Sequence, residues 1–412
     1  MIRTPSVDLA RFQAELAAMA EFRDPDSPGW TRRVFSGPYV RSREWVAGRM
    51  RDAGLEVRLD TAGNLIGTLA GGGRSALVTG SHTDTVAGGG RFDGPLGVLG
   101  AIEVARCIRD SGRKLRHELR VVDFLGEEPN DFGLSCVGSR AVAGTLTADH
   151  LATRDPSGRT LADALEAAGS DPLRIDEAAW AANTVGAFVE LHIEQGPVLE
   201  QAGVPVGVVS GIAGIERVVA TFDGQADHAG TTPMGTRHDA LCAAADAVLA
   251  VERLACEGQG AGVGTAGRIE ALPGALNVVP ARVQLWVEFR SVDDAWLDSQ
   301  RRAFEQAVSE AGRKRGVGAT VKRLSRTEPV VTSAEVRTAM TEAIGSLGLD
   351  YALLPSGAGH DTVQISRLGP VGMLFVPSVG GRSHCPEEMT SPEHLEAGVA
   401  ALLATLLVLD AR

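Results

Sequence analysis

The sequence predicts an α/β protein. Its main domain is expected to have a mixed, largely parallel sheet with helices on both faces, and to carry an inserted ferredoxin-like α+β domain. Three observations support this. Short β-rich runs alternate with helix-length segments from about residue 62 to 210, and the same alternation returns at the C-terminus. Residues 213–327, between these parts, follow a different order of strands and helices. Strands separated by helix-length connections are typical of βαβ units and of parallel pairing.

The elements of the main domain follow from its apolar runs. The predicted strands lie at 76–82, 118–128, 186–196 and 372–381, and the predicted helices at 95–110 and 391–411. Ser391 is a favourable cap for the last helix, with Pro392 in its first turn.

The middle of the chain has a different pattern. Residues 213–327 predict a strand, a helix, two strands, a helix and a last strand. This β-α-β-β-α-β order is that of a split βαβ, ferredoxin-like domain. We therefore predict a discontinuous main domain at 1–211 and 328–412, and an inserted domain at 212–327.

Composition excludes several classes of protein. The chain has 412 residues, 44% of them hydrophobic, which is enough for two domains with a core each. Its formal net charge is -12 and it has no long basic run, so nucleic-acid binding is not expected. The N-terminus does not resemble a signal peptide, and no segment reaches the roughly 18 consecutive apolar residues of a membrane span. A cytoplasmic location is the expectation.

The five cysteines are scattered and show no CxxC spacing. Their arrangement argues against both a disulfide framework and a thiolate zinc cluster.

Residues of metal-binding type follow several of the predicted strands. In open α/β sheets, ligands lie outside the carboxyl ends of the strands, so these side chains are expected to face one crevice. Histidine and carboxylate ligands without cysteine suit Zn, Mn, Co or Ni, and this set is large enough for two ions. The residues concerned are His82, Asp84, Asp93, Glu127, Glu128, His192, Glu194, Gln195 and His384.

The adjacent carboxylates of Glu127 and Glu128 would repel each other unless a cation lies nearby or each has its own task. One can bind a metal while the other acts as general base. Each residue taken alone also has a structural interpretation, such as a histidine at a strand end or Asp93 in a turn before Gly94. Because residues of metal-binding type occur at the ends of four apolar strands, a metal site is favoured over separate structural roles.

Taken together, the motifs resemble the M20 metallopeptidase clan, and within it the hydantoinase/carbamoylase amidohydrolase branch. The similarity covers most of the chain in order, and "HIEQG" distinguishes this branch from the peptidase branches. The matching stretches are "GSHTDTV" (80–86), "GRFDGPLGVLGA" (90–101), "EEPNDFG" (127–133), "GSRAVAG" (138–144), "ELHIEQGP" (190–197), "DHAGTTPM" (227–234), "NVVP" (277–280), "EFR" (288–290), "SGAGHDT" (356–362) and "VPSVGGRSHCPEE" (376–388).

The resemblance implies a role for each matched residue. His82 and His192 would bind one metal ion, Glu128 and His384 a second, and Asp93 would bridge them. Glu127 would be the general base, and Asp84 would orient the imidazole of His82.

The resemblance also implies substrate contacts. His228 would polarise the scissile carbonyl, Arg290 would pair with a substrate carboxylate, and Gln195 would contact the ureido or amide group. Asn277 resembles a further substrate-binding position. Apart from the resemblance, Gly357 and Gly359 indicate a loop whose backbone approaches the substrate closely, with His360 contributing a hydrogen bond. The inserted domain would serve as a lid and as the contact surface of a homodimer.

Two positions depart from the family pattern. Pro129 replaces a common glycine, and Arg382 stands where a small or apolar residue is usual. A cation at position 382 could repel a second metal ion or recognise an additional anionic group of the substrate. Cys385, beside a proposed ligand, is expected to be a small buried residue.

The expected activity is metal-dependent hydrolysis of the carbamoyl C–N bond of an N-carbamoyl-L-amino acid, giving the amino acid, CO2 and ammonia. The substrate would be a small ureido acid, and the cofactors two divalent metal ions. Allantoate amidohydrolase and β-ureidopropionase are the nearest alternatives. An aminoacylase or peptidase, and a binding protein without catalysis, are more distant ones.

Overall fold

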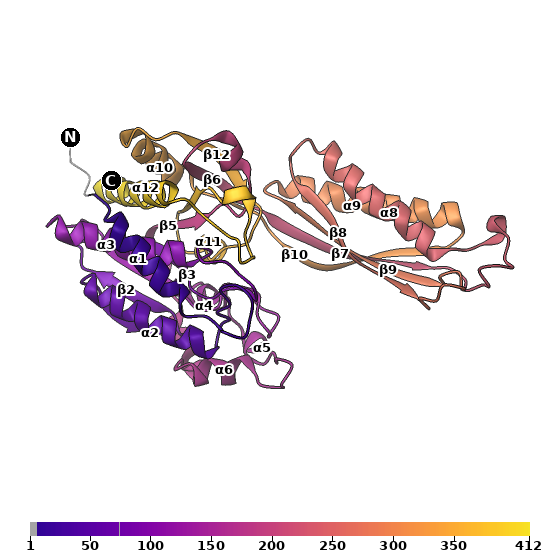
Figure 1. The fold of residues 1–412 in the computed structure, drawn as a ribbon, viewed down its shortest axis with the longest axis horizontal. Coiled ribbons are helices and arrows are strands. Elements are labelled where there is room, and N and C mark those ends of the chain that lie inside the picture. The colour runs from indigo at the N-terminus through magenta and orange to yellow at the C-terminus, as the bar shows by residue number, and fades with distance from the viewer. Residues whose placement is uncertain (1–5, 74) are drawn as a thin grey trace. The chain divides into compact units, whose positions relative to one another are not determined.

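The computed structural model describes residues 6–73 and 75–412, and these divide into two units (Figure 1). The first unit comprises residues 6–210 without residue 74, together with Thr332–Leu354 and His360–Arg412. The second comprises Gly211–Val331 and Pro355–Gly359. For comparison, the sequence-based boundaries of the inserted domain are 212 and 327.

The first unit is built on a mixed sheet. Its strand order is β1-β2-β4-β3-β5-β13-β6, with β12 beside β6, and the short β11 pairs with the end of β6. The strands are β1 (Glu56–Leu59), β2 (Leu65–Leu69), β3 (Ala76–His82), β4 (Glu118–Phe124), β5 (Val185–Ile193), β6 (Val206–Ile212), β11 (Val330–Val331), β12 (Tyr351–Ser356) and β13 (Val371–Val376).

The centre of this sheet is parallel. Strands β4, β3, β5 and β13 run parallel to one another, whereas β1, β2, β6 and β11 form antiparallel pairs. The prediction of a largely parallel sheet is therefore right for these four central strands and wrong for the four strands that pair antiparallel. The antiparallel pairing of the outer strands could not be predicted, because a short strand carries no local signal of its pairing direction.

Helices α1, α2, α3, α10 and α12 pack around one hydrophobic core, and α3 is buried along almost its whole length. A second, smaller core includes residues of α4, α6 and η1. The short helices α4 and α11 contact β4, β5 and β13. The helices are α1 (Leu9–Ala20), α2 (Gly37–Asp52), α3 (Pro95–Asp110), α4 (Val137–Val142), α5 (Ala148–Leu151), α6 (Leu161–Ala167), η1 (Pro172–Ala178), α7 (Val198–Ala202), α10 (Ala334–Ser346), α11 (Thr362–Ile365), η3 (Val379–Gly381) and α12 (Pro392–Ala411).

By length and composition, α12 is the one helix in the described chain that could cross a membrane, and 72% of its most apolar 18-residue window is buried in the protein. Its apolar surface packs in the core of the first unit, beside α3, α10 and β13. The same test is passed by core helices of soluble proteins, so this helix is weak evidence for a membrane span.

The second unit is an antiparallel sheet of four strands in the order β10-β7-β9-β8, with α8 and α9 packed on it. Its core is formed by apolar side chains from both helices and from β7 and β9. The elements are β7 (Gly214–Asp223), η2 (Met234–Thr236), α8 (Ala240–Glu257), β8 (Val263–Leu272), β9 (Arg282–Ser291), α9 (Asp294–Arg315) and β10 (Gly318–Thr327).

Candidate metal centre

Five of the predicted metal ligands meet at the carboxyl ends of the central strands of the first unit. His82 is the last residue of β3, His192 lies near the end of β5, and Glu128 follows β4. His384 belongs to the loop after β13, and Asp93 lies two residues before α3 begins. Because β4, β3, β5 and β13 are parallel neighbours, their carboxyl ends share one edge of the sheet.

The carboxylate of Asp93 lies at the centre of this cluster. Its Oδ1 is 3.2 Å from Nε2 of His192 and 3.6 Å from Nε2 of His82. Its Oδ2 is 3.1 Å from Nε2 of His384, which in turn lies 3.6 Å from Oε1 of Glu128. The ligand atoms thus form two groups that share Asp93: one with His82 and His192, the other with Glu128 and His384.

Hydrogen bonds to the backbone fix the tautomers of the two buried histidines. Nδ1 of His82 lies 3.0 Å from the carbonyl oxygen of Asp84, and Nδ1 of His192 lies 2.9 Å from that of Ile193. A carbonyl oxygen only accepts, so Nδ1 carries the proton in both rings. When neutral, each imidazole would therefore offer the lone pair of Nε2 to a metal ion on the side of Asp93, as metal-binding histidines do.

These residues fit a divalent metal. Among the described residues, no hydrogen-bond partner satisfies the buried Nε2 of His192, although Asp93 is close. Burial and the charge of Asp93 raise the pKa of Glu128 to about 7 in the protein without metal. Buried carboxylates that lie this close together are stabilised by a cation between them. Buried imidazole and carboxylate donors suit Zn, Mn, Co or Ni.

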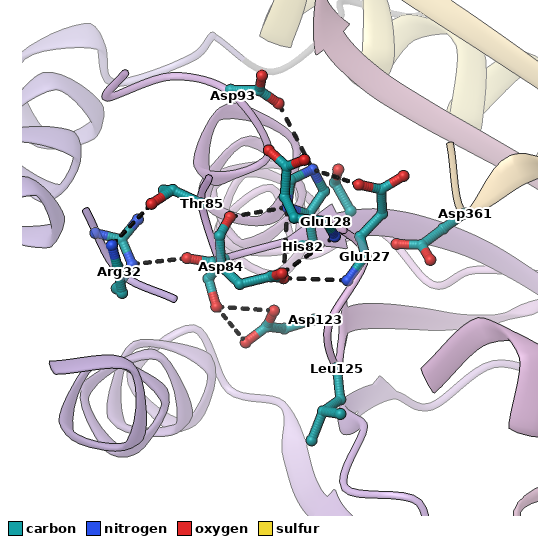
Figure 2. A network of polar contacts seen from close by, with 12 residues as sticks. Arg32, His82, Asp84, Thr85, Asp93, Asp123, Leu125, Glu127, Glu128 and Asp361 are labelled. Carbon is teal, nitrogen blue, oxygen red and sulfur yellow. Dashed lines mark hydrogen bonds and ion pairs between the residues drawn. The ribbon is translucent and has the colours of Figure 1, made fainter. Parts of the chain in front are cut away.

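Asp84 holds both adjacent glutamates in place. Its Oδ1 accepts the backbone N–H of Glu127 (3.2 Å), and its Oδ2 accepts that of Glu128 (3.1 Å) (Figure 2). Its Oδ1 also lies 3.6 Å from Nδ1 of His82. One fully buried carboxylate thus connects the end of β3 to the loop after β4.

The loop that carries Asp84 is itself fixed by a buried layer of charge. The guanidinium of Arg32, only 1% exposed, donates from Nε to the carbonyl oxygen of Thr83 (2.6 Å). The hydroxyl of Thr83 donates to the carboxylate of Asp123, which pairs with Arg43 at 3.4 Å. Arg43 thus pairs with the buried Asp123, and the charge of Arg32 lies near enough to Asp84 to interact with it. Sequence reasoning identified none of these supporting contacts.

The carboxylate of Glu127 lies on the same side of the cluster. Its Oε2 is 3.7 Å from Nε2 of His82, and its Oε1 accepts the thiol of Cys136 at 3.5 Å. Burial raises its pKa well above the usual range. The nearby charges of Asp361 and Glu128 add to this, and His82 opposes it. In Figure 2 the buried Asp361 lies next to Glu127, and its Oδ2 has no hydrogen-bond partner among the described residues.

Gln195 belongs to this cluster. Its Nε2 donates to Oδ2 of Asp93 at 2.8 Å and lies 3.3 Å from Nε2 of His384. Its buried Oε1 has no hydrogen-bond partner in the part of the chain that the structure describes. The amide therefore contacts the candidate ligands directly, with one acceptor free for a ligand.

His360 packs edge-on against the ring of His192, with 4.7 Å between ring centroids. Burial and the neighbouring imidazole lower its pKa well below the usual range, so it is neutral. These two histidines and Glu190 form a third group of metal-binding type. The oxygens of Glu190 already accept the hydroxyls of Ser81 and Thr362, at 2.8 and 2.6 Å. We therefore interpret this third group as structural support.

The remaining predicted substrate residues, His228, Asn277, Arg290 and Gly359, belong to the second unit. The backbone of Ala229 bonds to that of Asn277, which brings the His228 and Asn277 segments together. Nδ1 of the exposed His228 accepts the backbone N–H groups of Gly230 (3.0 Å) and Thr231 (3.2 Å). A neutral His228 therefore carries its proton on Nε2.

Arg290 donates to the carboxylate of Glu288 and to the carbonyl oxygen of Gly357. This second bond connects the end of β9 to the glycine-rich loop that contains Gly359.

Arg382 is half-exposed and pairs with Glu387 at 2.9 Å. Its charge is therefore partly neutralised by a neighbour in the same loop. The cysteine beside it, Cys385, is only partly buried and accepts from Nε of Arg382 at 3.4 Å. The expectation of a buried residue at position 385 was wrong, because its loop lies at the protein surface.

Comparison with known proteins gives consistent matches. The family described as Peptidase family M20/M25/M40 matches residues 78–408. The N-carbamoyl-L-amino acid amidohydrolase of Geobacillus stearothermophilus is 42% identical over 96% of this chain and 97% of its own length. The ureidoglycolate hydrolase of Oryza sativa subsp. japonica is 37% identical, covering 96% of this chain and 84% of its own. A crystal structure of a hydantoinase/carbamoylase family amidase from Burkholderia multivorans superimposes with a TM-score of 0.91, at 34% identity and 99% coverage of both chains.

Proposed function

The chain belongs to peptidase family M20/M25/M40, as a hydrolase of C–N bonds other than peptide bonds, and we propose that it hydrolyses the carbamoyl C–N bond of N-carbamoyl-L-amino acids. One water molecule enters, and the free amino acid, CO2 and ammonia leave. The observation that carries the proposal is the cluster around Asp93, where two groups of ligand-type atoms share one carboxylate beside Glu127.

Enzymes of this family use divalent metal ions, and the chain has candidate residues for two. We assign His82 and His192 to one ion, Glu128 and His384 to the other, and Asp93 to both. When bound, such ions lower the pKa of water and polarise a carbonyl oxygen. Zn, Mn, Co and Ni all suit these donors.

Glu127 is the proposed general base. Its carboxylate lies among the candidate ligands without belonging to either group of ligand atoms. It would take a proton from the attacking water and deliver it to the leaving nitrogen. The backbone N–H of Glu127 is held by Asp84, which fixes where its side chain departs from the loop.

The proposed substrate-binding residues have complementary hydrogen-bonding groups. The free Oε1 of Gln195 can accept an N–H of a ureido group. The guanidinium of Arg290 can pair with the carboxylate of the amino acid, and its bond to Gly357 holds the loop that contains Gly359. Asn277 lies beside the His228 segment. His360 would support the site by packing on His192.

His228 is the proposed donor to the developing oxyanion. Because its Nδ1 is occupied by two backbone N–H groups, the neutral ring offers Nε2–H. Replacing His228 with Ala is expected to lower kcat by about 10²–10³-fold, the usual cost of losing one such donor. Metal content, measured by elemental analysis, should stay unchanged. An equal loss of activity with His238→Ala, an exposed histidine of the same unit, would contradict a specific role.

The substrate panel tests the function itself. Protein stripped with a chelator and reloaded with each metal would be offered N-carbamoyl-L-amino acids, N-carbamoyl-β-alanine, allantoate, ureidoglycolate and N-acetyl-L-amino acids. Ammonia from the N-carbamoyl-L-amino acids at the highest kcat/KM supports the proposal. A preference for ureidoglycolate would instead match the plant relative. Silence on every ureido compound, with hydrolysis of the acetyl series, would show an aminoacylase.

We further propose a cytoplasmic homodimer formed through the second unit, which would also act as a lid. Strand β8 lies at the edge of its sheet and, within the described chain, pairs only with β9. This edge exposes Val263, Ile269 and Leu272, each at least 45% exposed. Exposed apolar edge strands favour pairing with another chain.

Sedimentation equilibrium should therefore give about twice the monomer mass of 43.0 kDa. The substitution Ile269→Lys is expected to weaken the association, because it places a charge on the apolar edge. A purely monomeric wild-type protein at micromolar concentration would contradict the dimer.

A further inference from the structure

Glu388 is a buried carboxylate that has no part in the chemistry proposed above. It lies four residues after His384, and only 1% of its surface is exposed. A buried carboxylate is costly unless its oxygens accept hydrogen bonds. The hydrogen-bond donors to Glu388 all belong to the two loops that carry Asp93 and His384.

One oxygen of Glu388 holds the backbone of the Asp93 loop. Its Oε1 accepts the N–H of Phe92 at 2.8 Å and that of Asp93 at 3.1 Å. The loop also passes directly over the carboxylate: a Cβ added to Gly90 would lie 2.1 Å from both Cδ and Oε1 of Glu388. Only glycine leaves room at position 90, so the loop and the carboxylate fit each other.

The other oxygen holds the residue before His384. Oε2 of Glu388 accepts the hydroxyl of Ser383 at 2.8 Å, and the same hydroxyl lies 3.0 Å from Oδ2 of Asp93. A hydroxyl has one proton, so it donates to only one of the two carboxylates at a time. Ser383 thus connects Glu388 to the shared carboxylate by a second route.

His384 needs such support because its backbone is strained. Its φ is +54°, in the left-handed region that residues with a side chain rarely adopt. Such a conformation persists only where the surroundings hold it. Its side chain is also 47% exposed, so packing alone holds it weakly.

We propose that Glu388 is a positioning residue that joins the Asp93 loop to the His384 loop and keeps these two metal-binding side chains at the spacing that the second ion requires. This inference rests on the proposed metal roles of Asp93 and His384. Glu388 does not contact substrate or metal itself; it acts through the backbone N–H groups of 92–93 and through Ser383.

The test is metal affinity, measured by titrating metal-free protein with Co²⁺ in competition with a chelator, below the unfolding temperature. Glu388→Ala is expected to weaken the ion bound by Asp93 and His384 by about 10–100-fold, as for other residues that orient metal ligands. Glu388→Gln should restore affinity to within about threefold, since its Oε1 can accept the same two N–H groups. The matched control is Glu387→Ala, which removes the exposed neighbour that pairs with Arg382.

Thermal unfolding of the metal-free variants separates positioning from stability. Loss of stability in Glu388→Ala with wild-type affinity for both ions would show a merely structural role and overturn the inference. Equal affinity losses in Glu388→Ala and Glu387→Ala would also overturn it. If Glu388→Ala does not fold, Ser383→Ala replaces it, and wild-type affinity in that variant has the same meaning. Wild-type protein that binds no divalent metal would overturn the proposed function as well.

Discussion

Replacing Glu127 with Gln is expected to lower kcat by about 10²–10⁴-fold, the range that a positioned general base contributes, while the protein still binds two divalent ions. The amide has nearly the shape of the carboxylate but cannot take a proton. The backbone N–H of residue 127 would still donate to Asp84, so the loop after β4 should keep its conformation. Single-turnover kinetics and metal analysis of the same sample measure both effects.

The matched variant is Glu128→Gln, one residue further along. Because the carboxylate of Glu128 faces His384 at 3.6 Å, we expect this variant to lose metal first and activity as a consequence. Adding excess metal should then recover part of the activity of Glu128→Gln and none of that of Glu127→Gln. The reverse pattern would mean that the two glutamates have exchanged roles.

The second large effect is expected from Asp93→Ala. Three imidazoles face this one carboxylate within 3.6 Å, so its removal takes a ligand from both candidate ions at once. Affinity for both ions should fall by more than about 100-fold, beyond the usual cost of losing a residue that only orients a ligand. Isothermal titration with Zn²⁺ or Mn²⁺ measures both affinities.

Asp131→Ala is the control for this experiment. Asp131 is a half-exposed carboxylate on the loop after Glu128, paired with Arg33, and it belongs to neither ligand group. The Asp131→Ala variant should bind two ions, as the wild type does. Loss of only one ion in Asp93→Ala would show that Asp93 serves a single site, and retention of both would remove it from the metal centre.

Much of the main sheet could be predicted from local pattern. The apolar run before His82 became β3, and the run before Glu127 became β4, because buried central strands are recognisable as short apolar segments. The pairing direction of β6 could not be predicted in this way, since it depends on β13, more than 160 positions further along the chain. Pairing partners that distant leave no signature in either segment.

The residues that support the candidate site show the same division. His82, His192 and His384 could be proposed as ligands because each lies at or after the end of an apolar strand and has the chemistry of a ligand. The role of Glu388 could not be recognised from the segment "CPEE", because its partner Asp93 is 295 residues away in the sequence. Asp361 and Cys136 likewise meet Glu127 only through folding.

The sequence by itself thus determined which segments are buried, from the apolar runs, and which chemistry is possible, from the side chains at their ends. Tertiary structure decided which atom of each side chain is free to act. The proton on Nδ1 of His82 and His192 is set by carbonyl oxygens, and the neighbouring placement of Glu127 and Glu128 by Asp84. The physical reason is that a hydrogen bond depends on distance and direction to within a few tenths of an ångström, and the fold alone supplies these.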